Sequence, residues 1–358
     1  MVIASGSNRA IPELMGTDVA AFFDPNGNMT SLEHLVGIDW NYRDNISKAT
    51  IISRPAATDD AEYYVYDSAG QRVRKIKETL VAGNTEIEEK IYLGGVEIKR
   101  IRTGSLKSLE RSDLHVMDDK TRIAIVNYWN IDTTNREVNS SADLNTNKIR
   151  YQYSNHLGSA SLELSGSGQL ISYEEYFPYG GTSFTTGNSQ KEVKIKEYRY
   201  TGKERDDSTG LYYFGARYYA PWMGRWLSAD PSGPSDGLNL YAYVMGNPIT
   251  FIDPDGMDST TVVVSKKEKV SKIGIFNLMQ KADKPETTEN ALPNIRINET
   301  NLKKLISKDG VIERKGIENI GFKSTDNITN TKRVDTIDVK IAHWYSNYDN
   351  KRTKKLTK

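Results

Sequence analysis

Residues 61–75 read AEYYVYDSAGQRVRK, and this stretch indicates the fold of the first part of the chain. Strand-forming residues stand on both sides of Asp67-Ser-Ala-Gly70, where Asp and Gly suit a tight hairpin turn. Apolar residues alternate within both arms, which is typical of strands with one buried face. The stretch therefore predicts an antiparallel β-hairpin.

The same succession of strand, turn and strand recurs in both directions from this hairpin. It is found in residues 90–101, 115–126 and 151–177, with turns at Gly94-Gly95, Asp118-Asp119-Lys120 and Ser165-Gly-Ser-Gly168. Residues 23–28 (FDPNGN) and 66–71 (YDSAGQ) share an aromatic-Asp-x-x-Gly-polar turn. Because Asp-x-x-Gly occurs in many hairpins, two copies alone leave the question open. Among so many hairpins they favour a repeat architecture, with little helix before residue 200.

Charge is distributed unevenly along the chain. Residues 258–358 contain 21 basic and 13 acidic side chains, whereas residues 1–257 contain 27 basic and 34 acidic ones. An acidic body is thus followed by a basic tail, and the two are expected to attract each other. The chain has no cysteine, which excludes disulfides and fits a cytosolic origin or export without oxidative folding. Met1 is not followed by a signal region, and no apolar run reaches membrane length.

Four motifs follow the hairpins at fixed spacing. They are YRYTGKERDDSTGLYYFGARYY (198–219), WLSADP (226–231), LNLYAYVMGNP (238–248) and DPDG (253–256). Together they closely resemble the Rhs repeat-associated core region, and the Tyr-Asp-x-x-Gly hairpins upstream also resemble this family. Residues 110–126 further resemble the C component of the bacterial insecticidal toxin complexes. The resemblance spans roughly residues 22–257, and the tail shows none.

This resemblance implies a mostly β fold in which antiparallel Rhs/YD hairpin repeats form part of a shell. It divides the chain into a shell segment (1–197), a self-cleaving core plug (198–257) and a variable effector tail (258–358). We expect the tail to be a small α+β or partly disordered unit. In the family, the shell holds the toxic C-terminal segment unfolded, and the core cuts it free.

The resemblance also implies partners and a route of delivery. The expected partners are the B-type shell component of a toxin complex and the remaining segment of the shell, with an unidentified target for the tail. A bacterial protein that is secreted or delivered into a target cell is expected, with no membrane span. A contact-delivered antibacterial Rhs toxin and a noncatalytic cell-surface repeat protein remain as alternatives.

Asp230 and Asp253 are each followed by proline, which restricts the preceding residue to extended conformations. A pair of carboxyl groups that shares one proton is suited to hydrolysing a peptide bond. From the residues alone, both Asp-Pro pairs also fit ordinary turns, and Arg217 fits a structural role. By resemblance, Asp230 and Asp253 occupy the protease positions, with Arg217 as the associated arginine and no cofactor needed. The expected cut lies around Met257-Asp258, and Asp255 is a third carboxylate with which Asp253 is easily confused.

Three further expectations concern side chains outside this set. The rings of the core region are expected to form one cluster: Tyr212, Tyr213, Tyr218, Tyr219, Trp222 and Trp226. The histidines His34, His115 and His156 stand singly, which favours structural roles. In the tail, Asp335, Asp338 and Lys340 lie on an expected strand and are consistent with a Mg²⁺-dependent nuclease, or simply with the solvated face of a strand. The sequence identifies no cofactor for the tail.

Overall fold

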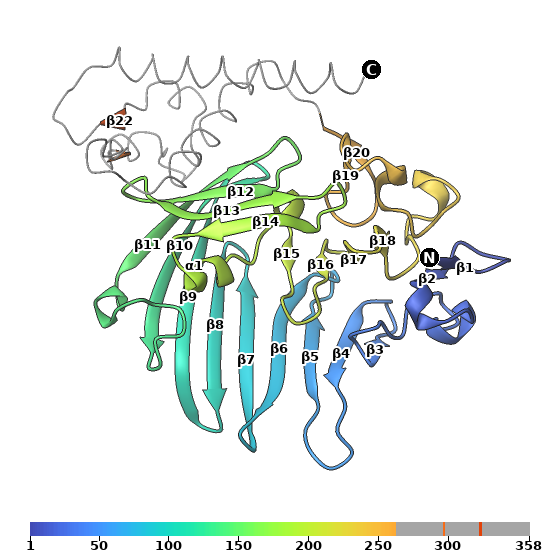
Figure 1. Cartoon of the computed structure of the whole chain (residues 1–358), viewed down its shortest axis with the longest axis horizontal. Helices are drawn as coiled ribbons and strands as arrows, with labels where there is room; N and C mark the ends of the chain where they lie inside the picture. Colours follow the sequence, from blue (N-terminus) through green and yellow to red (C-terminus); the bar gives the residue numbers. More distant parts are fainter. Residues whose placement is uncertain (263–295, 298–321, 324–358) are drawn as a thin grey trace.

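The computed structural model describes residues 1–262, 296–297 and 322–323. Its main element is a 12-stranded antiparallel sheet in which every strand pairs with its neighbour in sequence (Figure 1). The strands are β3 (Gly37–Trp40), β4 (Ile46–Ile52), β5 (Asp60–Tyr66), β6 (Arg72–Val81), β7 (Asn84–Leu93), β8 (Val96–Thr103), β9 (Leu106–Asp118), β10 (Thr121–Asp132), β11 (Asn147–Ser154), β12 (Ala160–Ser165), β13 (Leu170–Tyr176) and β14 (Thr182–Gly187). The expected mostly β fold of antiparallel hairpins is confirmed.

The turns at residues 67–70 and 24–27 have the same local geometry. The Gly70 N–H donates to the Asp67 carbonyl at 3.1 Å, and the Asp67 carboxylate accepts from the backbone of Ala69 and Gln71. Gly70 has φ +79°, a conformation that a side chain would strain. The Gly27 N–H likewise donates to the Asp24 carbonyl at 3.0 Å. The shared turn pattern in the sequence therefore corresponds to a shared structure.

The large sheet is strongly curved. In Figure 1, β12, β13 and β14 run across the ends of the long strands β5–β9. A smaller sheet is drawn to the right of β14, above β3–β6. That smaller sheet has four strands: β15 (Glu204–Arg205), β16 (Tyr212–Tyr213), β17 (Tyr218–Ala220) and β18 (Arg225–Trp226). It belongs to the core motifs, so one face of the large sheet carries the region in which the candidate site lies.

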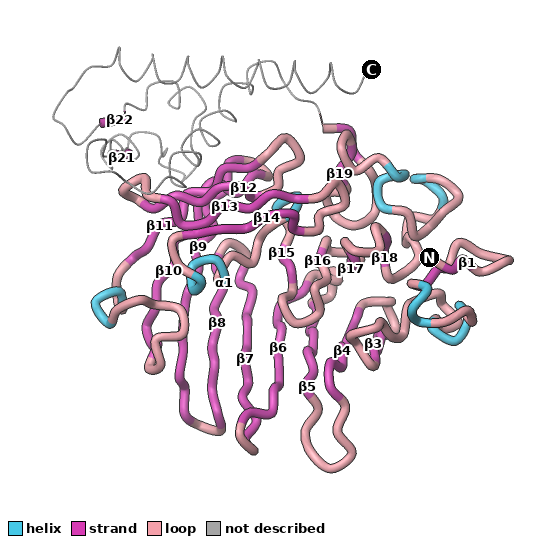
Figure 2. Tube along the Cα trace, viewed as in Figure 1, coloured by secondary structure: helices cyan, strands magenta, loops and turns pink. Residues whose placement is uncertain are grey.

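The remaining elements are short. Two-stranded sheets are formed by β1 (Val2–Ile3) with β2 (Ala10–Ile11), β19 (Phe251–Ile252) with β20 (Thr260–Thr261), and β21 (Arg296–Ile297) with β22 (Phe322–Lys323). In the part of the chain that the structure describes, helix is confined to brief segments (Figure 2), which are η1 (Glu13–Met15), η2 (Val19–Phe22), η3 (Ser141–Asp143), α1 (Gln190–Lys194), η4 (Tyr200–Gly202), η5 (Pro234–Asp236) and η6 (Tyr243–Gly246). Within the described residues, no helix is long and apolar enough to cross a membrane.

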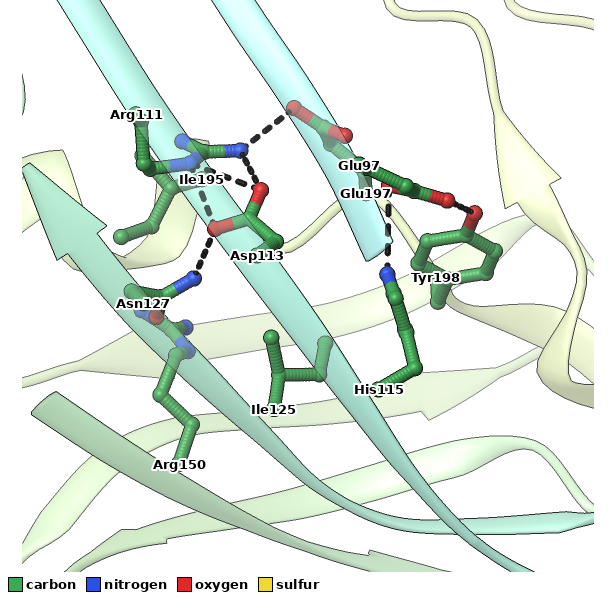
Figure 3. A pocket seen from close by; sticks show the side chains of 10 residues that line it. All are labelled: Glu97, Arg111, Asp113, His115, Ile125, Asn127, Arg150, Ile195, Glu197 and Tyr198. Carbon is green, nitrogen blue, oxygen red and sulfur yellow. Dashed lines mark hydrogen bonds and ion pairs between the residues drawn. The ribbon is translucent and has the colours of Figure 1, made fainter. Parts of the chain in front are cut away.

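Basic side chains form a row across the covered face of the sheet. Lys75 pairs in register with Lys90, Lys90 with Lys99, and Lys99 with Arg111, on β6 to β9. Carboxylates at the start of the core and just before it neutralise this row. They are Glu197, Glu204 and Asp206, with contacts of 2.6 Å (Lys75–Asp206), 2.9 Å (Lys90–Glu204) and 3.1 Å (Arg111–Glu197). Figure 3 shows the end of this network around Arg111.

The aromatic side chains of the core do not form the single cluster that we expected. Tyr212, Tyr219 and Trp226 pack together with Tyr200, Phe214 and Tyr243. Tyr218 and Tyr213 belong to a second cluster, which the N-terminal 40 residues complete. Trp222 is 46% exposed and meets the edge of His34. The division follows from strand geometry, because successive residues of a strand point to opposite faces.

The N-terminal segment holds the core from the other side. The Met29 N–H donates to the Leu227 carbonyl at 2.8 Å, and the Tyr241 hydroxyl donates to the Gly27 carbonyl at 2.9 Å. Leu227 also donates to the Tyr218 carbonyl at 3.1 Å. The chain that leads to Asp230 is therefore fixed between β17 and the N-terminal segment.

Candidate functional site

Arg217 lies immediately before β17 and brings the two expected aspartates together. Its Nη2 atom is 2.8 Å from Asp230 Oδ2 and 3.3 Å from Asp253 Oδ2. All three side chains are at most 5% exposed. The structure thus assembles the three side chains singled out in the sequence, although Asp230 and Asp253 are 23 positions apart.

The turn that carries Asp253 is tightly constrained. Asp253 Oδ1 accepts hydrogen bonds from the backbone N–H groups of Asp255, Gly256 and Met257, at 3.2, 2.7 and 3.2 Å. Gly256 has φ +85°, and a Cβ atom there would be 3.0 Å from the backbone nitrogen of Arg217. Only glycine fits both requirements. Since Oδ1 is occupied by the turn, Oδ2 is the oxygen that faces Arg217.

The same arginine contacts the backbone on the amino side of the expected cut. Arg217 Nε donates to the Gly256 carbonyl at 2.5 Å, and Nη2 donates to the Met257 carbonyl at 3.3 Å. A single nitrogen atom therefore contacts both carboxylates and the carbonyl of the Met257-Asp258 bond. A cation at that place withdraws electrons from the carbonyl and stabilises negative charge that forms on its oxygen.

Burial changes the proton affinity of the two carboxyl groups. It raises the pKa of Asp253 to about 6 and also raises the pKa of Asp230, although Arg217 opposes the shift in both cases. Burial lowers the pKa of Arg217, but a guanidinium keeps its proton at any physiological pH. Carboxyl groups with raised pKa values that share one cation are suited to holding a proton between them.

Asp255 is clearly distinguished from Asp253. Its carboxylate Oδ1 accepts from the Met257 N–H at 3.1 Å, and its side chain lies on the exposed side of the turn. Its backbone carbonyl accepts from the Ala216 N–H at 2.9 Å. Asp255 therefore helps to hold the turn, whereas Asp253 contacts the arginine.

Lys203 is a contributor that the sequence analysis missed. Its Nζ donates to the Pro254 carbonyl, and it lies 5.3 Å from the centre of the Phe214 ring. Burial lowers the pKa of Lys203, and the nearby Asp253 and Asp255 oppose that shift. The only signal for it was its place in the YRYTGKE motif. Its proximity to Asp253 depends on a fold that joins residues 50 positions apart.

The backbone beyond the expected cut is also bound. The Ser235 hydroxyl donates to Asp258 Oδ1 at 2.9 Å, and the Ser259 N–H donates to Asp236 Oδ2 at 2.7 Å. The Ser259 hydroxyl bonds to the same carboxylate oxygen. Strand β20 then pairs with β19. The Met257-Asp258 bond therefore lies between two anchored segments.

Comparison with known proteins places the chain in a toxin family. No protein-family model matches it. The chain is 41% identical to toxin subunit YenC1 of Yersinia entomophaga over 260 residues, which cover 72% of this chain and 26% of that subunit. It is a toxin-complex C-component-like protein. It spans about a quarter of the length of this relative and of toxin subunit YenC2 of the same organism.

Solved structures agree with the sequence comparison. The crystal structure of the TcdB2–TccC3 complex matches 72% of this chain and 12% of that chain, with a TM-score of 0.66 and 38% identity. The Photorhabdus luminescens toxin-complex holotoxin pore matches 74% of this chain and 12% of that one, with a TM-score of 0.66 and 36% identity. The tRNA nuclease WapA of Bacillus subtilis is 31% identical over 245 residues, which cover 67% of this chain and 9% of WapA.

The other expected site residues of this C-component-like chain have separate outcomes. His34 Nε2 lies 2.8 Å from the Thr209 carbonyl, His156 Nε2 lies 3.0 Å from the Ile249 carbonyl, and His115 Nε2 lies 3.2 Å from Glu97. Among the described residues, no group of three or more metal-binding side chains is arranged to hold an ion. Asp335, Asp338 and Lys340 lie outside the described residues, so the nuclease hypothesis stays a prediction.

Proposed function

We propose that the core of this chain is a single-turnover aspartyl autoprotease that cuts the Met257-Asp258 bond. The observation that carries the proposal is the position of Arg217 Nη2, which contacts Asp230, Asp253 and the Met257 carbonyl oxygen. Residues 198–257 would form the protease, residues 1–197 would form part of a shell, and residues 258–358 would be the released effector tail.

The chemistry requires one carboxylate and one neutral carboxyl group. The ionised aspartate takes a proton from water as the water oxygen attacks the Met257 carbonyl carbon. Arg217 stabilises the oxyanion, and the neutral aspartate protonates the Asp258 nitrogen as the C–N bond breaks. The raised pKa of Asp253 favours it as the neutral member near pH 6. Because the substrate is part of the same chain, its high effective concentration compensates for a modest acid–base pair.

The proposal extends to a partner and a delivery route. The relatives include toxin subunit YenC1 of Yersinia entomophaga and the TccC3 component, which is solved together with TcdB2. These support a B-type shell component as partner, with which this chain would enclose its own tail as part of a secreted insecticidal toxin complex.

A second candidate is a contact-delivered antibacterial toxin with the same core. The similarity to WapA favours it, because that protein is a tRNA nuclease of a bacterium. A neighbouring immunity gene that protects cells from the expressed tail would support this candidate. Copurification with a B-type component would support the insecticidal one.

The intact mass of the purified chain and four variants tests the autoprotease. The parent should yield fragments 1–257 and 258–358, whereas Asp230→Asn and Asp253→Asn should each remain intact, because a single carboxylate lacks either the acid or the base. Arg217→Ala should slow or abolish the cut, and Asp255→Asn should have less effect. A parent that stays intact would contradict the function. Cleavage of either aspartate variant would show that the dyad is wrongly assigned.

A further inference from the structure

The five residues that follow the expected cut make contacts with residues 1–257 that do not involve Met257. Thr260 pairs with Ile252 and Thr261 with Phe251, and the Val262 N–H donates to the Thr250 carbonyl at 2.9 Å. Closer to the cut, Asp236 accepts two hydrogen bonds from Ser259. These contacts join residues 258–262 to two separate parts of the body.

Hydrolysis of the Met257-Asp258 bond changes few of these interactions. The products are a carboxylate at Met257 and an ammonium group at Asp258. The new carboxylate replaces a carbonyl that Arg217 already contacts, so its charge strengthens that interaction. The new ammonium adjoins Ser259, whose partner is the Asp236 carboxylate. Neither new charge removes a donor or an acceptor from the residues that hold the tail.

We propose that β19 together with Ser235 and Asp236 forms a retention clamp for residues 258–262 of the cleaved tail. This inference rests on the proposed autoproteolysis, but it separates two events, namely cutting and release. The start of the tail stays in place as strand β20 after the peptide bond is gone. Release then requires a second step that opens the short sheet and frees Ser259 from Asp236.

The clamp can be tested on the full chain after it has cut itself. A denaturing gel reports cleavage, and size-exclusion chromatography after dilution reports how fast the tail leaves the body. Val262→Pro removes the N–H that bonds to Thr250, and Asp236→Ala removes the acceptor for Ser259. Each should raise the dissociation rate about tenfold, since tenfold corresponds to about 1.4 kcal/mol, close to the net value of one or two hydrogen bonds.

Matched controls separate the clamp from general damage. Val262→Ile keeps both the backbone donor and an apolar side chain where Val262 packs against the aromatic cluster, and Glu33→Ala removes a carboxylate from an exposed position far from the clamp in sequence. Both should leave the dissociation rate within about twofold of the parent's. Equal rates for the parent, Val262→Pro and Asp236→Ala would overturn the clamp, because other contacts would then retain the tail.

A second chain makes the test independent of self-cleavage. It carries a recognition sequence for a site-specific protease between Met257 and Asp258, and added protease makes the cut. If the unaltered parent stays intact on a denaturing gel, the proposed autoproteolysis fails, while this chain still decides the clamp. Slow tail loss that Val262→Pro accelerates supports the clamp, whereas immediate loss in every variant refutes it.

Discussion

At the scale of single residues, Arg217 connects both aspartates with the backbone before the expected cut. Its guanidinium contacts two carboxylates and the carbonyls of Gly256 and Met257. The Leu240 carbonyl also accepts from Nη1 at 3.4 Å, and five partners in different directions require the planar, branched group of arginine, which lysine cannot reproduce. The choice of residue type at this position is therefore a matter of geometry as well as charge.

The first prediction follows from that geometry. Arg217→Lys keeps the charge but loses the separate Nε and Nη contacts, so cleavage should slow by about 10²-fold or more, the usual effect of losing one oxyanion donor. The time course of cleavage after refolding from denaturant measures it. Arg102→Lys, on the exposed part of β8, should cleave at the parental rate. If the Arg217→Lys chain is cleaved at the same rate as the parent, the guanidinium group is not needed for cleavage.

The second prediction concerns pH. Because burial raises the pKa of Asp253 to about 6, the neutral acid is lost as the pH rises through 6, and cleavage should slow above that value. Refolding the chain across a pH series and quantifying both fragments gives the profile. A rate that keeps rising to pH 8 would contradict the assignment of a protonated Asp253.

The same shift has a consequence for stability. In the unfolded chain an Asp pKa is about 3.9, so between about pH 4 and 6 the folded state binds more protons than the unfolded state. The free energy of unfolding should therefore fall as the pH rises through this window, by at most about 3 kcal/mol. Urea denaturation of an Asp230→Asn chain, which keeps Arg217 and is expected to remain uncut, measures this slope. Adding Asp253→Asn should flatten it.

The fourth prediction concerns Lys203, which positions the turn through the Pro254 carbonyl. Lys203→Met should slow cleavage about tenfold by loosening the turn. It also removes a positive charge near Asp253, which should raise the pKa of that carboxyl group. The alkaline limb of the pH profile should therefore shift to higher pH. A purely structural defect would slow cleavage without moving that limb, which makes the pH profile the decisive measurement.

At the scale of elements, buried ion pairs attach the core to the central strands of the sheet. Glu204 on β15 is 3% exposed and contacts Arg72, Lys75 and Lys90. Burial opposes its ionisation, but these cations outweigh it and hold the pKa of Glu204 well below its usual range. Such a network fixes the position of β15 on β6 and β7, because each buried cation requires its partner.

The fifth prediction tests this attachment. Glu204→Gln leaves three buried cations short of a partner, so the free energy of unfolding should fall by about 3–5 kcal/mol. Glu110→Gln is the matched control, since Glu110 pairs with the more exposed Arg100 and Lys107 and should cost about 1 kcal/mol or less. Urea denaturation in an Asp230→Asn chain compares them. Similar losses in both would mean that the buried network does not hold the core.

At the scale of the whole molecule, three stretches far apart in sequence converge on the site. The curved sheet carries the core through its basic row, the N-terminal segment holds the chain before Asp230, and β19 holds the backbone beyond Met257. The expected attraction between the acidic body and the basic tail stays a prediction. Salt screens exposed charges within about 10 Å at 0.1 M, so a tail held mainly by charge should dissociate faster at high salt.

Local sequence patterns predict the hairpins, and the resemblance to a known family predicts the three side chains of the candidate site. Hairpins such as 61–75 can be predicted from sequence because a turn and the alternation of apolar and polar residues are local properties. The chemistry of Asp230 and Asp253 was not readable in that way, since Asp-Pro equally suits a turn. Three features are visible only in the folded chain: one nitrogen of Arg217 contacts both carboxylates, Lys203 holds the Asp253 turn, and the aromatic side chains form two clusters. Those facts depend on contacts between residues far apart in the chain, which local pattern does not encode.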